Sequence, residues 1–268
     1  MINISIIKND DDIETVEFDK YYNEKLTPEI LEFLSKYTNI KFGCEFNQPV
    51  DNLPESLTHL KFVYEFNQPV DNLPNSITHL VFGRKFNQPV NNLPNSITHL
   101  KFGNNFNQPV DNLPNSLTYL KFGNNFNQPV DNLPTSLTNL KFGFDFNQPV
   151  DILPNFLTNL TFGYCFNHPV NNLPNFLKEI HFGMYFDQSI TNLPSSVTHV
   201  FFEKDSRFRI TKNTIFPDSI THLIYLNSNK IKTDKFPKNL VQLTLRSSYP
   251  WPIKNQNFEI KRLRNILY

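Results

Sequence analysis

The chain has 268 residues, of which 39% are hydrophobic, and its 25 Lys and Arg residues balance 25 Asp and Glu residues. A net charge of zero argues against nucleic acid as a partner, because binding to phosphates needs a broad positive field. No run approaches the roughly 18 apolar residues of a membrane span, and the acidic start MINISIIKNDDD differs from a secretory signal, which has a basic flank and an apolar stretch. We therefore expect an intracellular, cytoplasmic monomer that is not secreted and makes no membrane contact.

The first 36 residues form a predicted N-terminal cap. Residues 1–45 hold five Lys against ten Asp and Glu, so this end is acidic. Thr27-Pro28-Glu29 supplies an N-cap, a first-turn proline and an early acid, and apolar residues at helical spacing follow. We predict a short helix over residues 27–36, because an open amino end would expose the apolar core of the next segment.

From Phe46 to Phe186, one phrase close to FNQPVDNLPNSLTHLKFG restarts eight times at a strict period of 20 residues. A fixed period of this size is typical of a solenoid, in which each unit packs only against its neighbours. We predict one continuous repeat domain over residues 37–245. Cys44 and Cys165 lie six repeats apart, too far for a disulfide at about 4.8 Å per strand, and free thiols suit a reducing compartment.

Each repeat predicts one short strand and an irregular return path. In the copy over residues 66–85, the alternation of residues 77–82 predicts a half-buried strand with Leu80 and Phe82 turned inward. Two prolines, Pro69 and Pro74, disfavour helix in the remainder. Six positions are apolar in almost every copy and should stack as core columns; in this copy they are Phe66, Val70, Leu73, Ile77, Leu80 and Phe82.

Two columns of asparagine accompany the apolar columns. The first contains Asn47, Asn67, Asn87, Asn107, Asn127, Asn147 and Asn167, and the second contains Asn52, Asn72, Asn92, Asn112, Asn132, Asn172 and Asn192. We predict that their amides satisfy backbone groups in the turns or bond the next Asn along the stack. Asp187 and Ile152 interrupt the columns, and we expect local irregularity there.

The period continues less regularly to the end of the chain. Residues 220–225 and 240–245 repeat the strand pattern, which brings the predicted total to eleven or twelve strands, paired in parallel with one strand per coil. Residues 201–268 hold 13 Lys and Arg against 5 Asp and Glu. We predict that residues 246–268 form a basic C-terminal cap, in which the final coil is covered by Trp251, Phe258, Ile260, Leu263, Ile266 and Leu267, with Lys261, Arg262 and Arg264 facing water.

The phrase Phe-Asn-Gln-Pro-Val with Leu-Pro-Asn-Ser-Leu-Thr resembles the FNIP repeat, a relative of leucine-rich repeats. The resemblance implies a mainly β, right-handed solenoid, with one short parallel strand per 20-residue coil on its concave side and a helix-poor convex side. It also implies a role in protein interactions in an amoebal cell or a host infected by a giant virus. Some relatives carry an F-box, whose opening resembles residues 26–34, so a client-recognition subunit of a ubiquitin ligase is the alternative function.

The outward strand residues supply the candidate site. One column begins with His59, His79, His99 and Tyr119, and the neighbouring column contains Lys61, Val81, Lys101, Lys121 and Lys141 beside a strip of glycine. Like charges on adjacent strands are destabilising, and an acidic partner would relieve them. We predict a partner-binding strip formed by His59, Lys61, His79, His99, Lys101, Tyr119, Lys121 and Lys141.

Catalysis and metal binding find little support in the sequence. Parallel strands point the histidines in the same direction, so they do not converge on a metal. No phosphate loop, nucleophile elbow or paired-cysteine motif is present. A carbohydrate-cleaving enzyme would need carboxylates on the strand face, where Glu179 and Glu203 are almost the only acids. We therefore predict a non-enzymatic scaffold with no catalytic, cofactor or metal residues.

Overall fold

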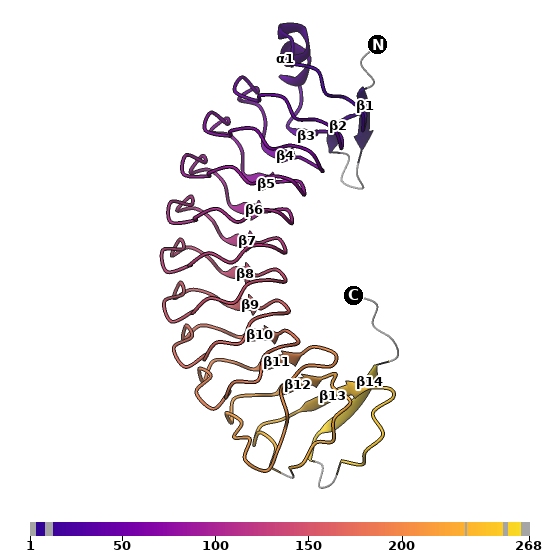
Figure 1. Ribbon diagram of the computed structural model, residues 1–268, viewed down its shortest axis with the longest axis vertical. Helices are drawn as coiled ribbons and strands as arrows, with labels where there is room; N and C mark the ends of the chain where they lie inside the picture. Colours follow the sequence, from indigo (N-terminus) through magenta and orange to yellow (C-terminus); the bar gives the residue numbers. More distant parts are fainter. Residues whose placement is uncertain (1–3, 9–12, 234, 254–256, 264–268) are drawn as a thin grey trace. The chain divides into compact units, whose positions relative to one another are not determined.

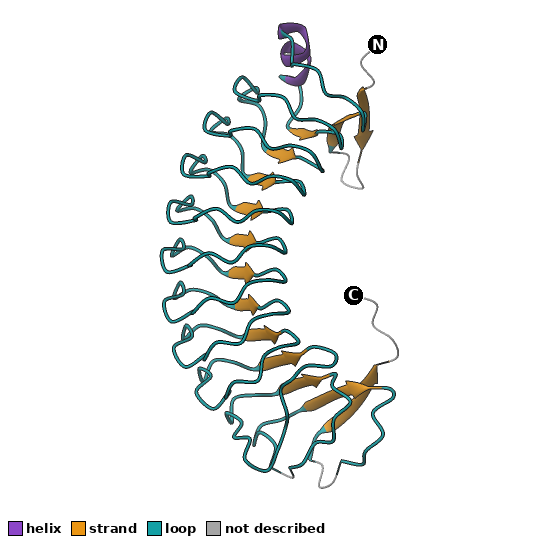
Figure 2. Cartoon of the chain, viewed as in Figure 1, coloured by secondary structure: helices purple, strands orange, loops and turns teal. Residues whose placement is uncertain are grey.

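The computed structural model describes residues 4–8, 13–233, 235–253 and 257–263. It divides into two compact units. The first comprises residues 1–128 and 132–137, and the second comprises residues 129–131 and 138–268. Both are built from short strands joined by long irregular loops, as the strand arrows and the loops of Figure 2 show.

The first unit contains seven strands and a helix among the described residues. They are β1 (Ile4–Lys8), β2 (Glu14–Phe18), α1 (Pro28–Leu34), β3 (Asn39–Lys41), β4 (His59–Lys61), β5 (His79–Val81), β6 (His99–Lys101) and β7 (Tyr119–Lys121). From β2 to β7, each strand pairs in parallel with the next strand of the chain (Figure 1). The register from β3 onward advances by one repeat, so Asn39 lies beside His59 and His59 beside His79.

The second unit contains a further seven strands among the described residues. They are β8 (Asn139–Lys141), β9 (Asn159–Thr161), β10 (Glu179–Phe182), β11 (His199–Phe202), β12 (His222–Tyr225), β13 (Gln242–Arg246) and β14 (Glu259–Leu263). Each pairs in parallel with its neighbour in sequence. The predicted parallel solenoid with one strand per coil is therefore confirmed.

The six apolar columns form the core, as predicted. Phe66, Ile77 and Leu80 are at most 1% exposed, and Leu73, the least buried of the six in that coil, is 6% exposed. Where one copy of the repeat leads into the next, two Phe rings stack closely, with 3.6 Å between the ring centroids of Phe62 and Phe66. Between coils the Phe66 ring stacks on Phe86 at 6.1 Å. Burial of each such side chain stabilises the fold by about 1.5–3 kcal/mol.

The first asparagine column satisfies backbone groups, as predicted. The Oδ1 atom of Asn47 accepts a hydrogen bond from the backbone N–H of Asn67 at 2.9 Å, and that of Asn67 accepts from Asn87 at 2.8 Å. The amide of Gln68 donates to the Asn47 carbonyl at 3.1 Å. The substitution of Asp187 for Asn does not interrupt the hydrogen bond to the preceding coil, because the backbone N–H of Asp187 still donates to Asn167 at 3.0 Å.

The second asparagine column has a different partner from the one predicted. The Nδ2 atom of Asn72 donates to the Asp51 carboxylate at 3.1 Å, and that of Asn92 donates to Asp71 at 3.0 Å. Both ends of these hydrogen bonds are exposed side chains. This column therefore joins surface side chains and does not satisfy buried backbone groups.

All seven glycines of the chain occupy a single position of the repeat, which is residue 43, 83, 103, 123, 143, 163 or 183. None of them has a positive φ angle, so backbone conformation does not require glycine. The reason is close approach, because a Cβ atom at Gly103 would lie 1.9 Å from the carbonyl oxygen of Gly83, and one at Gly123 would lie 1.8 Å from that of Gly103. Val63 takes this position in one coil.

The amino end agrees with the predicted helix. The Thr27 side chain caps α1 by accepting a hydrogen bond from the backbone N–H of Ile30 at 3.4 Å, and Ile30 and Leu34 are buried. The predicted number of strands was wrong at this end, because β1 was not predicted. This strand pairs antiparallel with β2.

The described part of the carboxyl end adds one more strand to the sheet. Within residues 246–268, β14 continues the parallel pairing as a further strand. Trp251 is 41% exposed, and the Phe258 ring packs edge-on against Phe236 at 5.0 Å. The predicted cap residues Arg264, Ile266 and Leu267 lie outside the described residues.

Candidate functional site

The predicted strip lies on the exposed face of the strands. Seven of its eight residues belong to β4, β5, β6 and β7 of the first unit, and we call these seven the histidine–lysine strip; they are His59, Lys61, His79, His99, Lys101, Tyr119 and Lys121. Each strand has only three residues, with the middle one buried and the two flanking ones turned outward. The parallel register places equivalent side chains directly beside each other.

The aromatic members of the strip form one continuous stack. The ring centroids of His59 and His79 are 4.2 Å apart, those of His79 and His99 are also 4.2 Å apart, and those of His99 and Tyr119 are 5.7 Å apart. The ring planes are within 15° of parallel in every pair. The stack therefore presents a file of ring edges along the strand face.

A threonine behind each histidine fixes the orientation of its ring. The Thr78 hydroxyl lies 2.9 Å from the His79 Nδ1 atom and 3.3 Å from the carbonyl oxygen of Thr58. A hydroxyl has one hydrogen, so both contacts are hydrogen bonds only when Nδ1 carries the imidazole proton and Thr78 donates to Thr58. Thr58 and Thr98 repeat the arrangement at His59 and His99. The Nε2 atom of each ring is then an acceptor.

The surroundings of the stack favour neutral histidine. Burial, together with the smaller effects of the neighbouring His59, His99 and Lys101, lowers the pKa of His79 to about 4. Burial also lowers the pKa of His59 and His99, and Lys101 adds to the effect at His99. At neutral pH the stack is therefore an uncharged aromatic surface.

Lysines supply the positive charge beside this neutral stack. Lys61, Lys101 and Lys121 are exposed, and Lys101 lies directly beside Lys121 in the register of β6 and β7. The Nζ atom of Lys101 lies 5.4 Å from the centroid of the Tyr119 ring. The same column extends to Lys41 on β3, but Glu17 neutralises that residue with an Nζ to Oε1 distance of 2.9 Å. Lys41 is therefore already paired with an acid.

The eighth predicted residue, Lys141, lies on β8 in the second unit. An acidic residue, Glu203, lies near it. Burial raises the pKa of the Glu203 carboxyl, and the positive charges of Lys141 and His181 oppose that shift. Lys141 therefore has an acidic neighbour within its own unit.

Sequence reasoning missed a polar group in the second unit. On β10, the Glu179 carboxylate accepts a hydrogen bond from Asn159 at 2.9 Å and is in hydrogen-bond contact with the Nε2 atom of His181. The His181 ring also stacks on Phe201 at 4.7 Å. The i, i+2 spacing of Glu179 and His181 on one strand was the available signal, because such residues share a face.

The described part of the chain contains neither a candidate metal site nor a membrane-spanning helix. Across residues 4–8, 13–233, 235–253 and 257–263, no group of three His, Cys, Asp or Glu residues is placed to hold a metal ion. Within the same ranges, no helix is both long enough and apolar enough to cross a membrane. The two cysteines, Cys44 and Cys165, are free thiols.

Comparison with known proteins identifies the repeat. The FNIP Repeat family matches this chain over residues 46–72, 66–105, 89–125, 106–145, 126–165 and 166–205. No curated protein matches the chain.

Two solved structures match this chain. One is the crystal structure of the giant-virus protein CroV588, described as a novel circular LRR protein structure, with 42% sequence identity and a TM-score of 0.80. That match covers 92% of this chain and 39% of CroV588. The other is YopM from Yersinia enterocolitica WA-314, with 17% identity and a TM-score of 0.46, which covers 84% of this chain and 59% of YopM. This chain thus spans less than two thirds of either protein.

Proposed function

Because this chain belongs to the FNIP repeat family and folds as a leucine-rich-repeat-like solenoid, we propose that it is a non-enzymatic scaffold that binds another protein on the histidine–lysine strip. The observation that carries the proposal is the in-register file of neutral rings beside exposed lysines on β4 to β7. Repeat solenoids offer such extended surfaces for recognition, and aromatic side chains such as that of Tyr119 are enriched where proteins bind each other.

The charge pattern favours an acidic partner. Lys101 and Lys121 lie on adjacent strands, and like charges in that arrangement destabilise the free protein. A carboxylate between them would remove the repulsion and gain a charge-assisted hydrogen bond. The complementary charge would also speed the encounter of the two proteins.

The spacing of the strip also favours a particular pattern in the partner. Val81 separates Lys61 from Lys101 in the lysine column, and adjacent strands lie about 4.8 Å apart. The two lysines are therefore based about 10 Å apart, which is about three residues of an extended chain. A partner surface that presents two acidic groups about 10 Å apart, with an apolar group between them over Val81, would match this order.

Affinity capture from the native cell with a charge-reversed control tests the proposal. The triple variant K61E/K101E/K121E reverses the strip, and K20E/K25E/K36E makes the same change of charge at exposed lysines off the strip. We expect proteins that are retained by wild type and by the control to be lost by the strip variant, and mass spectrometry identifies them. Retention of every partner by K61E/K101E/K121E would refute the proposed surface.

The ubiquitin-ligase alternative stays a prediction. The segment that resembles an F-box opening forms α1, of seven residues, and β3 begins at Asn39 shortly after it. A pull-down with a ligase adaptor tests this alternative directly, since a scaffold without an F-box should leave the adaptor unbound.

A further inference from the structure

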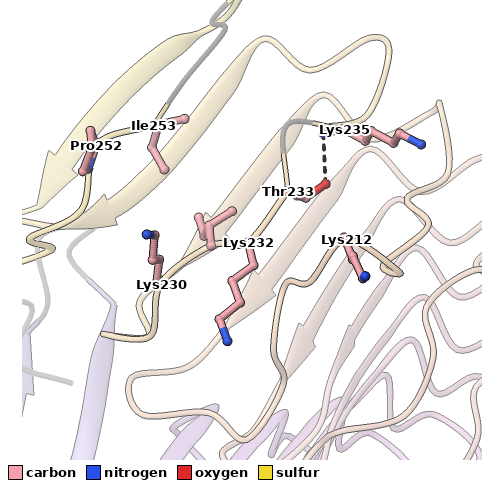
Figure 3. Close-up of a pocket in the computed structure, with 8 residues that line it drawn as sticks. Lys212, Lys230, Lys232, Thr233, Lys235, Pro252 and Ile253 are labelled. Atoms are coloured by element: carbon pink, nitrogen blue, oxygen red, sulfur yellow. Dashed lines mark hydrogen bonds between the residues drawn. The ribbon is translucent and has the colours of Figure 1, made fainter.

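The second unit contains a hollow with a strongly basic lining. It has a volume of about 530 Å³ and is lined by Lys212, Lys230, Ile231, Lys232, Thr233, Lys235, Pro252 and Ile253. Figure 3 shows these side chains around the hollow, on three segments of chain that follow β11, β12 and β13. Four of the eight lining residues are therefore lysines, in a chain whose net charge is zero.

The positive charge of this hollow lacks a balancing acid among the described residues. None of its eight described lining residues is acidic, and none of the ion pairs between described residues involves its lysines. The acid of this sequence segment, Asp234, lies outside the described residues. Four like charges around one hollow repel each other, so an anion bound among them would be favoured.

The segments that form the hollow are held in place by hydrogen bonds. The backbone N–H of Lys232 donates to the Ile210 carbonyl at 3.0 Å, and that of Ile231 donates to the Tyr249 hydroxyl at 2.8 Å. The Lys230 ammonium lies 5.2 Å from the centroid of the Trp251 ring. The backbone carrying the lysines is thus positioned before any ligand arrives, which reduces the entropy cost of binding.

The hydroxyl of Thr233 adds a neutral donor to the lysines. Its Oγ1 atom accepts a hydrogen bond from the backbone N–H of Lys235 at 3.0 Å (Figure 3). Because that bond uses an oxygen lone pair, the hydroxyl hydrogen can donate to an oxygen of a ligand. Lysine ammonium groups carry three donors each on flexible stems, so they can turn toward several oxygen atoms.

We propose that this hollow binds a compact ligand that bears two or more phosphate groups. Phosphate oxygens accept several hydrogen bonds from ammonium groups, and lysine is a common phosphate-binding side chain. The volume lies within the usual range of small-molecule sites, about 300–1,000 Å³. A nucleic acid would need a longer basic track than one hollow in a neutral chain provides, so a small polyphosphate fits better.

Titration with tripolyphosphate tests the proposal through a built-in reporter. Trp251 is the only tryptophan of the chain, and it contacts the Lys230 ammonium, so a ligand that moves Lys230 should change its fluorescence. We expect a saturable change at about 0.15 M salt that weakens as salt is raised. Calorimetry measures the same dissociation constant independently, and bound ligand should raise the melting temperature.

Matched variants distinguish a site from general charge attraction. K212Q/K232Q removes two lysines of the hollow, and K178Q/K204Q removes two exposed lysines of the same unit outside it. We expect the first pair to weaken tripolyphosphate binding by at least about tenfold, which is about 1.4 kcal/mol, and the second pair by less than about twofold. Equal weakening by both pairs, or no saturable binding by the wild type, would overturn the proposal.

Further probes identify the kind of phosphate compound. Comparable affinity for ATP and tripolyphosphate, with weak binding of AMP, would assign the site to a phosphate chain. Tighter binding of inositol trisphosphate would assign it to a ring polyphosphate or a lipid headgroup. Binding of single-stranded DNA that is much tighter than binding of every small phosphate, and equally reduced by K178Q/K204Q, would replace the proposed site by a diffuse nucleic-acid surface.

Discussion

At the scale of the residue, the histidine stack links the candidate site to pH. The folded chain lowers the pKa of His79 from 6.5 to about 4, so the unfolded chain takes up the proton first as pH falls. The stability that depends on neutral His79 is therefore fully present above pH 6.5 and is lost as pH falls from 6.5 toward about 4. We expect His79→Asn, which copies Asn139 and Asn159 of the same column, to lose less stability over this range than the wild type.

Urea unfolding of both proteins at about pH 7.5 and about pH 4.5 measures this difference. The carboxylates titrate in both proteins and cancel in the comparison. His168→Asn, outside the stack, serves as the control and should follow the wild type. If His79→Asn and the wild type lose the same stability between the two pH values, the stack is not the pH-sensitive element.

The glycine column allows a second prediction at the same scale. A methyl group at Gly103 would meet the backbone of Gly83, with 1.9 Å to its carbonyl oxygen, and backbone cannot move away as a flexible side chain can. We expect Gly103→Ala to destabilise the protein by about 1–3 kcal/mol, the usual cost of overpacking. Thermal melting checks it, with Asn104→Ala at the exposed neighbour as the control. Identical melting temperatures for Gly103→Ala and the control would contradict the close contact.

At the scale of the element, the two asparagine columns of one coil should differ in energy. Asn67 accepts the backbone N–H of Asn87 at 2.8 Å, whereas Asn72 donates to an exposed Asp51 side chain at 3.1 Å. We expect Asn67→Ala to cost about 1 kcal/mol, because a backbone donor loses its partner, and Asn72→Ala to cost less than about 0.5 kcal/mol. Denaturant unfolding compares them, and each is the other's control. Equal costs would mean that the backbone rung contributes nothing specific.

The sequence predicted those contacts that recur in every repeat. Identical residues every 20 positions fixed the strand register, the six core columns and the first asparagine column, because each contact recurs between neighbouring coils. The partner of Asn72 could not be predicted. Asp51 belongs to the preceding coil, and the direction of the Asn72 side chain depends on the turn between Val70 and Leu73. The strands β1 and β14 were missed because ISIIK and EIKRL lack the repeat phrase.

The candidate sites depend on longer-range information. The arrangement of the strip could be predicted because its members occupy two fixed positions of the repeat. The lysine hollow could not, because Lys212, Lys232 and Pro252 come from irregular segments after three different strands. Their proximity depends on loops whose lengths depart from the period, such as the 23-residue step between Pro194 and Pro217.

At the scale of the whole molecule, stability in a solenoid is the sum of contacts between neighbouring coils, so the ends of the described chain should open first. β1 has four exposed residues of five and β14 has three of five, whereas Leu80 of β5, Leu100 of β6 and Ile180 of β10 are fully buried. We expect amides of β1 and β14 to exchange with deuterium at least about tenfold faster than those of β5, β6 and β10, after correction for intrinsic rates. Peptide-level mass spectrometry checks this within each unit separately. Protection of β14 equal to that of β10 would show that residues beyond the repeats close the core as firmly as a further coil does.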